Sequence, residues 1–354
     1  MVEVGKIGDK TLVLDGRYIS IFRGGTLMNK WIYMGYLLPD GNAYIYRRRV
    51  HIKELSGNTL TDYQIKIEIG AGDPIWEHAR SAGEDIRFCY HPEEEMLSYW
   101  IEKYDPDAEE AIIWVKVPEI PANSEIEIYM YYGNPEVPSA SDGDATFELF
   151  DDFDDGVQDT SKWDTYSYTT PSFEETPEGM LRVTDDSSNE EIGYYVSKKS
   201  FKASDFGFAL RVRSRYHMTS GTWSHQMVVG ILHDGTYYVD KEPNAYWICH
   251  NPTYSGVYLM SPSQSKLDEG LPFATDGEFY VRELRVTKGT SGTISFWRDD
   301  GLTLSWSGSY EHTEGYVVIG HRGGGSEQGW SEFDWALVRK YTEPEPSVSV
   351  GGEE

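Results

Sequence analysis

The chain has 354 residues, a formal net charge of −28 at neutral pH, and 59 acidic against 31 basic side chains. This length allows two ordinary domains with buried cores. The excess of acid argues against nucleic acid as a partner, because contacts to phosphates require clustered lysine and arginine. No stretch approaches the roughly 18 apolar residues that a membrane-spanning helix needs.

The two cysteines, Cys89 and Cys249, lie far apart in the sequence, which excludes a disulfide framework and favours buried thiols. Glutamine is scarce and glutamate abundant, a composition typical of thermophile proteins. Met1 is not followed by a charged and then apolar secretory leader. We therefore expect either no secretion by that route or a signal that has been removed.

Residues 1–45 are predicted to be a docking segment of strands and extended chain. Thr11 to Phe22 alternates apolar and polar residues around an Asp-Gly turn, which predicts a hairpin. Residues 1–50 carry eight basic and four acidic side chains, in contrast to the acidic remainder. A segment this short cannot hold its own core, so it covers either the next domain or a partner chain. The charge contrast favours assembly with another copy.

Residues 46–146 are predicted to form an antiparallel β-sandwich. Tyr63 to Ile69 alternates as a half-buried strand does, and similar runs recur at short spacing with Gly, Pro and Asn between them. Seven motifs in order resemble the domain of unknown function 2341, which implies an all-β fold and a cell-surface association without established chemistry. The motifs are Tyr46-Arg47-Arg48, Asp62-Tyr63-Gln64, Gly83 to Phe88, Tyr99 to Glu102, Trp114 to Pro118, Tyr129 to Pro135, and Ser141-Asp142-Gly143.

Residues 147–351 contain about a dozen short strand-like runs, the pattern of a large jelly-roll sandwich. The acidic run that opens this part carries aspartates between Phe150 and Phe153, and like charges this close call for a counter-charge such as calcium. A solvated acidic turn is the other interpretation, and both stay open.

This part resembles the concanavalin-like lectin and laminarinase-type glucanase superfamily. The resemblance is carried by Phe150 to Phe153, Thr160 to Trp163, Ser197 to Phe201, and Phe333 to Tyr341. It implies a structural calcium that bridges the first and last strands, with carboxylates from Asp152 and Asp334 and the carbonyl of Gly207. An Asp334 that only caps an edge strand is the alternative.

The glucanases of that superfamily carry Glu-x-Asp-x-x-Glu on one strand, which places the acids on one face at the separation of retaining hydrolysis. The sequence lacks this pattern. Asp240 and Glu242 are an alternating pair, but they stand in a turn-like context before Pro243. No nucleophile elbow, zinc-peptidase motif or phosphate loop is found either. The chain is therefore predicted not to be an enzyme.

Aromatic residues are concentrated in the middle of this third part, and they suit sugar rings or a protein surface because they combine an apolar face with a polar edge. The predicted ligand-binding residues are Trp223, Tyr237, Tyr246, Trp247 and Tyr254. We expect an all-β, surface-exposed protein of a cell or a prokaryotic virion that binds glycan or protein, stiffened by calcium and assembled through residues 1–45. A purely structural oligomeric subunit and an atypical glycan hydrolase using Asp240 or Glu242 remain as alternatives.

Overall fold

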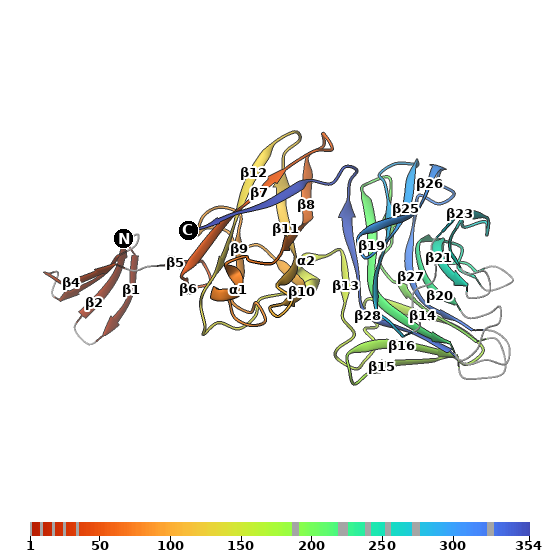
Figure 1. Cartoon of the computed structure of the whole chain (residues 1–354), viewed down its shortest axis with the longest axis horizontal. Coiled ribbons are helices and arrows are strands. Elements are labelled where there is room, and N and C mark those ends of the chain that lie inside the picture. The colour runs from red at the N-terminus through yellow and green to blue at the C-terminus, as the bar shows by residue number, and fades with distance from the viewer. Residues whose placement is uncertain are drawn as a thin grey trace. The chain divides into compact units, whose positions relative to one another are not determined.

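The computed structural model describes residues 2–7, 10–15, 18–23, 26–32, 35–185, 191–218, 226–237, 242–251, 256–270, 277–323 and 329–354 (Figure 1). By its contacts the chain divides into two units. The first unit contains Met1–Thr146 together with Pro346–Glu354, and the second unit contains Phe147–Glu345. Each is built almost wholly from antiparallel strands, so the all-β fold class is confirmed.

The first unit contains an N-terminal four-stranded meander and a sandwich of two facing layers. The meander has the order β1(Val2–Ile7), β2(Lys10–Asp15), β3(Tyr18–Arg23), β4(Thr26–Ile32), and β2 and β3 form the predicted hairpin. One layer of the sandwich has the order β10(Tyr99–Asp105), β11(Glu110–Ile120), β8(Leu60–Ile69). The other has the order β29(Ser347–Glu353), β7(Tyr46–Lys53), β12(Glu125–Tyr132), β9(Arg87–Cys89).

The strand β29 corrects the predicted end of the C-terminal domain at residue 351. Ser347 pairs with Lys53 and Val350 with Val50, so this strand extends the sheet of the first unit (Figure 1). Its end is held by side chains of that unit: Glu353 accepts a hydrogen bond from the Tyr132 hydroxyl at 2.6 Å and lies 2.9 Å from His78. Polar composition at the end of the sequence concealed this pairing.

The buried aspartate Asp85 connects two of the seven motifs, Gly83 to Phe88 and Tyr129 to Pro135, and so explains why they occur together. Asp85 is fully buried, and its carboxylate accepts hydrogen bonds from the backbone N–H groups of Arg80, Gly133 and Asn134 at 2.7–3.0 Å. Buried carboxylates persist where such donors satisfy them. Asp85 therefore ties the loop before β9 to the turn after β12, and its role is structural.

Residues 35–45 pack on the first unit. The two-stranded hairpin β5(Tyr36–Leu37) and β6(Ala43–Tyr44) surrounds a turn at Pro39 to Gly41. Leu38 and Tyr44 are buried in a cluster with Cys89 and Tyr131. The last residues of the predicted docking segment, 35–45, therefore cover the domain that follows them in the same chain.

The second unit is a sandwich of two eight-stranded antiparallel sheets. The back sheet has the order β15(Ser172–Thr176), β16(Met180–Asp185), β28(Gly329–Tyr341), β19(Gly207–Met218), β24(Tyr280–Val286), β25(Ser291–Arg298), β26(Gly301–Ser309), and β13(Leu149–Asp151) also pairs with β28. The front sheet has the order β14(Trp163–Tyr168), β17(Ile192–Ser197), β27(Glu314–Arg322), β20(Gln226–His233), β21(Tyr246–Asn251), β22(Gly256–Met260), β23(Lys266–Gly270), and β18(Phe201–Lys202) also pairs with β27.

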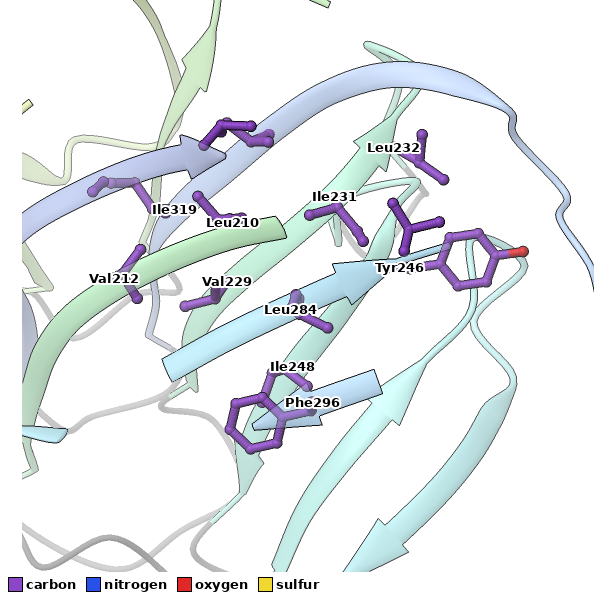
Figure 2. Close-up of a cluster of buried hydrophobic side chains, with 14 of the residues drawn as sticks. Leu210, Val212, Val229, Ile231, Leu232, Tyr246, Ile248, Leu284, Phe296 and Ile319 are labelled. Atoms are coloured by element: carbon purple, nitrogen blue, oxygen red, sulfur yellow. The ribbon is translucent and has the colours of Figure 1, made fainter. Parts of the chain in front are cut away.

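The core of the second unit lies between these sheets (Figure 2). Because side chains of a strand alternate between its faces, every second residue enters this layer. The back sheet contributes Leu210, Val212, Leu284 and Phe296, and the front sheet contributes Val229, Ile231, Ile248 and Ile319. The remaining positions of both sheets point outward, and there the two sheets differ in chemistry.

The helices are short. The structure has α1(Ile75–His78) and α2(Gly143–Thr146), each of four residues. Within the described ranges no helix has the length and apolarity that crossing a membrane would require.

Candidate functional site

The outer face of the front sheet carries an aromatic cluster, which we call the tyrosine face. Tyr194 on β17, Val228 on β20, Trp247 on β21 and Val318 on β27 are buried together, away from the core of the sandwich. Tyr166, Tyr237 and Tyr258 are half-buried against them. Aromatic rings on the outer side of a sheet offer apolar surface with polar edges.

Three tyrosines of this face have nearly parallel rings. Tyr166 stacks on Tyr237 with ring centroids 3.6 Å apart and an interplanar angle of 15°. Tyr194 lies 5.9 Å from Tyr166 and 6.0 Å from Tyr237 at 14° and 11°. Burial raises the pKa of Tyr194 and of Tyr237, so their hydroxyl groups stay protonated at neutral pH.

A cleft of 370 Å³ opens beside the stacked rings. It is lined by Asp164, Thr165, Tyr166, Val196, Ser197, Lys198, His233, Gly235, Tyr237 and Tyr316. The charged members of this lining, Asp164 and Lys198, form an ion pair at 3.2 Å. The cleft therefore combines tyrosine rings with hydroxyl groups and a lining whose formal charges cancel.

A β-bulge brings His233 to the cleft. The pairing of β20 with β27 shifts between Gly230 and His233, and Ile231 and Leu232 are both buried in the core. Leu232 has a φ of 55°, in the left-handed region that a leucine in a strand rarely adopts. An extra residue at a bulge changes the side on which later side chains emerge, so His233 reaches the outer face.

Two buried nitrogen atoms of this face have no hydrogen-bond partner within the described part of the chain. One is Nε2 of His233, whose other ring nitrogen, Nδ1, lies 3.3 Å from the carbonyl oxygen of Asn244. The other is the indole Nε1 of Trp247. Burial lowers the pKa of His233, so its ring is neutral at pH 7. A buried polar atom without a partner is uncommon in folded proteins and calls for an explanation.

Only two of the five predicted ligand-binding residues are found on the tyrosine face in the described structure. Tyr237 and Trp247 lie on the tyrosine face. Tyr246 does not, because neighbouring residues of a strand point to opposite faces: it is fully buried in the core, and its hydroxyl accepts a hydrogen bond from the backbone N–H of Glu311 at 2.8 Å. Its prediction as a ligand residue is wrong. Trp223 and Tyr254 lie outside the described residues.

Tyr166, Tyr194, Tyr316 and His233 were missed by the prediction from sequence. Tyr166 and Tyr168 alternate within the run from Trp163 to Tyr168, which was a usable signal for a strand with one aromatic face. No sequence pattern announced the bulge that turns His233 outward.

Asp240 and Glu242, the residues of the alternative hydrolase, do not form a carboxylate pair in the described structure. Glu242 forms an ion pair with Arg322 of β27, and Asp240 lies outside the described residues. Tyr194 lies close enough to this pair for both charges to act on its pKa.

The residues predicted to bind calcium do not fit one site. The Asp334 carboxylate forms an ion pair with Arg213. Gly207 pairs with Tyr341, whereas Asp334 lies beside Arg213, six residues along β19. At 3.2–3.4 Å per residue these positions are about 20 Å apart, so Gly207 cannot share a cation with Asp334. Its glycine is explained by close packing, since a Cβ there would lie 2.6 Å from the carbonyl oxygen of Tyr341.

The aspartate predicted to bind calcium, Asp152, is not the buried member of the acidic run. Asp152 is exposed, whereas Asp151 is buried and accepts hydrogen bonds from the indole N–H of Trp163 at 2.7 Å and from the backbone N–H of Phe153 at 3.1 Å. Within the described ranges no three His, Cys, Asp or Glu side chains are grouped as metal ligands would be. Calcium binding by Asp152 and Asp334 stays a prediction.

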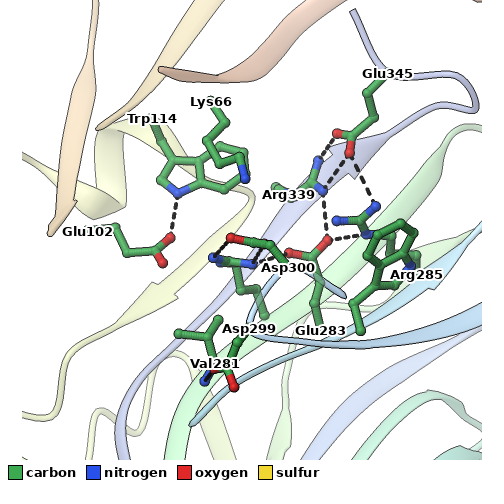
Figure 3. Close-up of polar contacts among 12 residues, drawn as sticks. Lys66, Glu102, Trp114, Val281, Glu283, Arg285, Asp299, Asp300, Arg339 and Glu345 are labelled. Carbon is green, nitrogen blue, oxygen red and sulfur yellow. Dashed lines mark hydrogen bonds and ion pairs between the residues drawn. The ribbon is translucent and has the colours of Figure 1, made fainter. Parts of the chain in front are cut away.

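The outer face of the back sheet, which we call the arginine face, is charged (Figure 3). Glu283 is buried and contacts three buried or nearly buried arginines: Arg211 at 3.0 Å, Arg339 at 2.7 Å, and Arg285. Burial alone would raise the pKa of Glu283, but the three guanidinium groups outweigh it and hold the pKa well below its ordinary value.

Comparison with known proteins gives one family match. A family model described as a domain of unknown function (DUF2341) matches residues 82–166, from the loop before β9 to β14. The resemblance to this family is confirmed over that range, which is shifted toward the C-terminus from the predicted 46–146. No protein of curated function matches the chain in sequence.

Solved structures similar to the chain include carbohydrate-binding proteins and a glycan-active enzyme. The Emp47p carbohydrate recognition domain is 14% identical with a TM-score of 0.40, and the match covers 54% of this chain and 94% of that domain. The carbohydrate-binding module CBM66 from Bacillus subtilis is 14% identical with a TM-score of 0.33, covering 56% and 99%. The β-glucanase from Bacillus licheniformis is 11% identical with a TM-score of 0.39, covering 55% and 97%.

Proposed function

We propose that this chain is a non-enzymatic, surface-exposed protein that binds a glycan in the cleft of the tyrosine face. The observation that carries the proposal is the cleft itself, in which Tyr166, Tyr237 and Tyr316 stand beside His233 and an internally neutral Asp164–Lys198 pair. Sugar rings pack their C–H faces on aromatic rings and their hydroxyl groups on polar edges, and the lining provides both.

Binding without hydrolysis is supported by the charges around the cleft. Glycoside hydrolysis uses two carboxyl groups that flank one bond. Among the described lining residues Asp164 is paired with Lys198, and the nearby Glu242 is paired with Arg322. A location on a cell or virion surface and assembly through residues 1–45 belong to the same proposal, and they rest on the family resemblance and the charge contrast of the sequence.

The test uses calorimetric titration with cellohexaose, laminarihexaose and mannohexaose, after an oligosaccharide array has ranked neutral and acidic glycans. Tyr166→Ala and Tyr237→Ala should each weaken binding about tenfold, because a lost aromatic contact is worth about 1 kcal/mol or more. Tyr280→Ala, a half-buried tyrosine of β24 in the back sheet, is the matched control and should bind as the wild type does.

A wild-type protein that binds none of the arrayed glycans at millimolar concentration would contradict the proposal. Release of shorter saccharides during the titration would instead support the hydrolase. Equal losses for Tyr280→Ala and Tyr237→Ala would show that the effect follows from stability and not from the cleft.

A further inference from the structure

His233 is the residue of the cleft whose position is hardest to explain by folding alone. It is fully buried, yet it stands on the outer side of the sheet among Tyr237, Tyr316 and the other lining residues. The bulge that places it there requires Leu232 to adopt a positive φ of 55°. Backbone strain of this kind persists where the surrounding structure enforces it, and it clusters at functional sites.

The contacts of the imidazole determine which nitrogen carries the proton. Nδ1 lies 3.3 Å from the Asn244 carbonyl oxygen, which can only accept a hydrogen bond. Nδ1 must therefore be the N–H donor in the neutral ring, and Nε2 is left with a lone pair. Asp234 and His312, the charged or titratable neighbours of His233, act on its pKa less than burial does, and the ring remains neutral at pH 7.

We propose, on the basis of the glycan-binding function above, that Nε2 of His233 accepts a hydrogen bond from a hydroxyl group of an uncharged sugar bound beside Tyr237. This nitrogen is buried and has no partner within the described residues, so it can accept a hydrogen bond from a bound ligand. A sugar hydroxyl provides that donor. Carboxylate and sulfate groups provide none, and they would face a lone pair in a lining without surplus positive charge.

The ring of Tyr237 lies beside the imidazole of His233. Its centroid lies 4.9 Å from that of His233 at an angle of 59°, and Nε2 is closed to solvent. Binding therefore includes the displacement of whatever group covers Nε2, together with formation of the hydrogen bond. Tyr237 would contribute a stacking surface beside the acceptor.

The chain offers a matched pair of variants. In His233→Asn the short amide can replace Nδ1 toward Asn244 but does not reach the position of Nε2. In His233→Gln the longer side chain places an amide oxygen near Nε2. We expect His233→Asn to weaken cellohexaose, laminarihexaose or mannohexaose binding about tenfold, whichever of these the wild type binds, and His233→Gln to retain most of the affinity. Thermal melting of both variants checks that they are folded.

A second measurement does not depend on any variant being folded well. In ¹⁵N-histidine spectra of the wild type, the unprotonated Nε2 resonance of His233 should move on addition of the bound hexasaccharide, as expected when a lone pair accepts a hydrogen bond. A resonance that stays in place at saturation would overturn the inference, as would full affinity in His233→Asn. If the wild type binds none of the arrayed glycans, the proposed function itself fails. Preference for acidic over neutral glycans on the array would preserve glycan binding and contradict only the inference about His233.

Discussion

The two outer faces of the second unit use polar groups in opposite ways. On the arginine face, charges are abundant and are paired with one another: Glu283 has three guanidinium partners, and Arg213 has Asp334. On the tyrosine face, the charged residues that line the cleft form one ion pair, Asp164 with Lys198. Two buried nitrogen atoms of this face, those of His233 and Trp247, have no partner within the described residues. A face whose charges form ion pairs stabilises the sandwich, whereas a cleft beside the buried Nε2 of His233 is suited to a ligand that donates a hydrogen bond.

The same alternation of residues produces both faces. On β19, Leu210 and Val212 enter the core while Arg211 and Arg213 emerge on the outside. On β17 and β21 the outward positions are Tyr194 and Trp247. The alternation that builds the core therefore constrains only the inward residues, and the outward residues of the two sheets differ in chemistry.

The largest expected effect is on the arginine face. Glu283→Gln removes the charge that three buried arginines share, so the free energy of unfolding should fall by about 3–5 kcal/mol. Urea denaturation at pH 7 measures this change. Glu314→Gln, which breaks the exposed pair with Lys202, is the control and should cost less than about 1 kcal/mol. Hexasaccharide affinity of the folded Glu283→Gln protein should be unchanged; a loss of affinity would break the separation of the two faces.

The pH dependence of that variant has a definite sign. Because the pKa of Glu283 is lowered by folding, its stabilising contribution is fully present above the ordinary glutamate value and is lost as the pH falls toward the lower, folded-state value. The difference between wild type and Glu283→Gln should therefore be largest near pH 7 and smaller at pH 3. If the free energies of unfolding of wild type and Glu283→Gln differed equally at pH 7 and pH 3, the negative charge of Glu283 would not be the source of its stabilising effect.

A smaller effect on stability is expected at Glu175 of β15. Unlike Glu283, whose neighbours are arginines, Glu175 lies near other carboxylates. Burial and the adjacent Asp155 and Asp151 raise the pKa of Glu175 to about 7. Since folding raises this pKa, ionisation destabilises the folded state as the pH rises from about 4.5 through 7. Glu175→Gln should stabilise the protein by about 1 kcal/mol at pH 8, or 2–4 °C in Tm, and less at pH 5. Melting curves of both proteins at the two pH values measure it, and a loss of stability at pH 8 would contradict the assignment.

The smallest effect is expected at Asp334, where the arginine face meets solvent. Its pair with Arg213 is partly exposed, so Asp334→Ala should cost less than about 1 kcal/mol. If Asp152 and Asp334 bind calcium as predicted, the wild type should melt at a higher temperature in calcium than in chelator, and Asp334→Ala should abolish that difference. Equal melting temperatures in calcium and in chelator would contradict the predicted calcium site and would leave Arg213 as the partner of this carboxylate.

The strands were predictable wherever one face of the strand enters a core. The alternating run from Tyr63 to Ile69 became most of β8, and Tyr46 to Ile52 became most of β7. Strand β29 was missed because Ser347 to Glu353 is short and polar, and its place depends on a partner strand nearly 300 residues away in the sequence. Pairing at this separation leaves no local signal.

The candidate site was predictable as a region but not as a set of atoms. Tyr237 and Trp247 were identified from aromatic density, which cannot tell an outward residue from an inward one, and Tyr246 was included wrongly for that reason. Assigning faces requires the register of β21, and that register is known only once β20 and β22 are in place. His233 depended on a bulge, which composition and spacing do not reveal.

The strand β29 also sets the order in which the protein can be completed. A ribosome releases β7 early and releases Ser347–Glu353 only after all of residues 147–345, so one edge of β7 stays open while the second unit is being made. The second unit is contiguous and can fold as soon as it emerges. The domain that is translated first is therefore finished last, and until then it exposes a strand edge to which another nascent chain can pair.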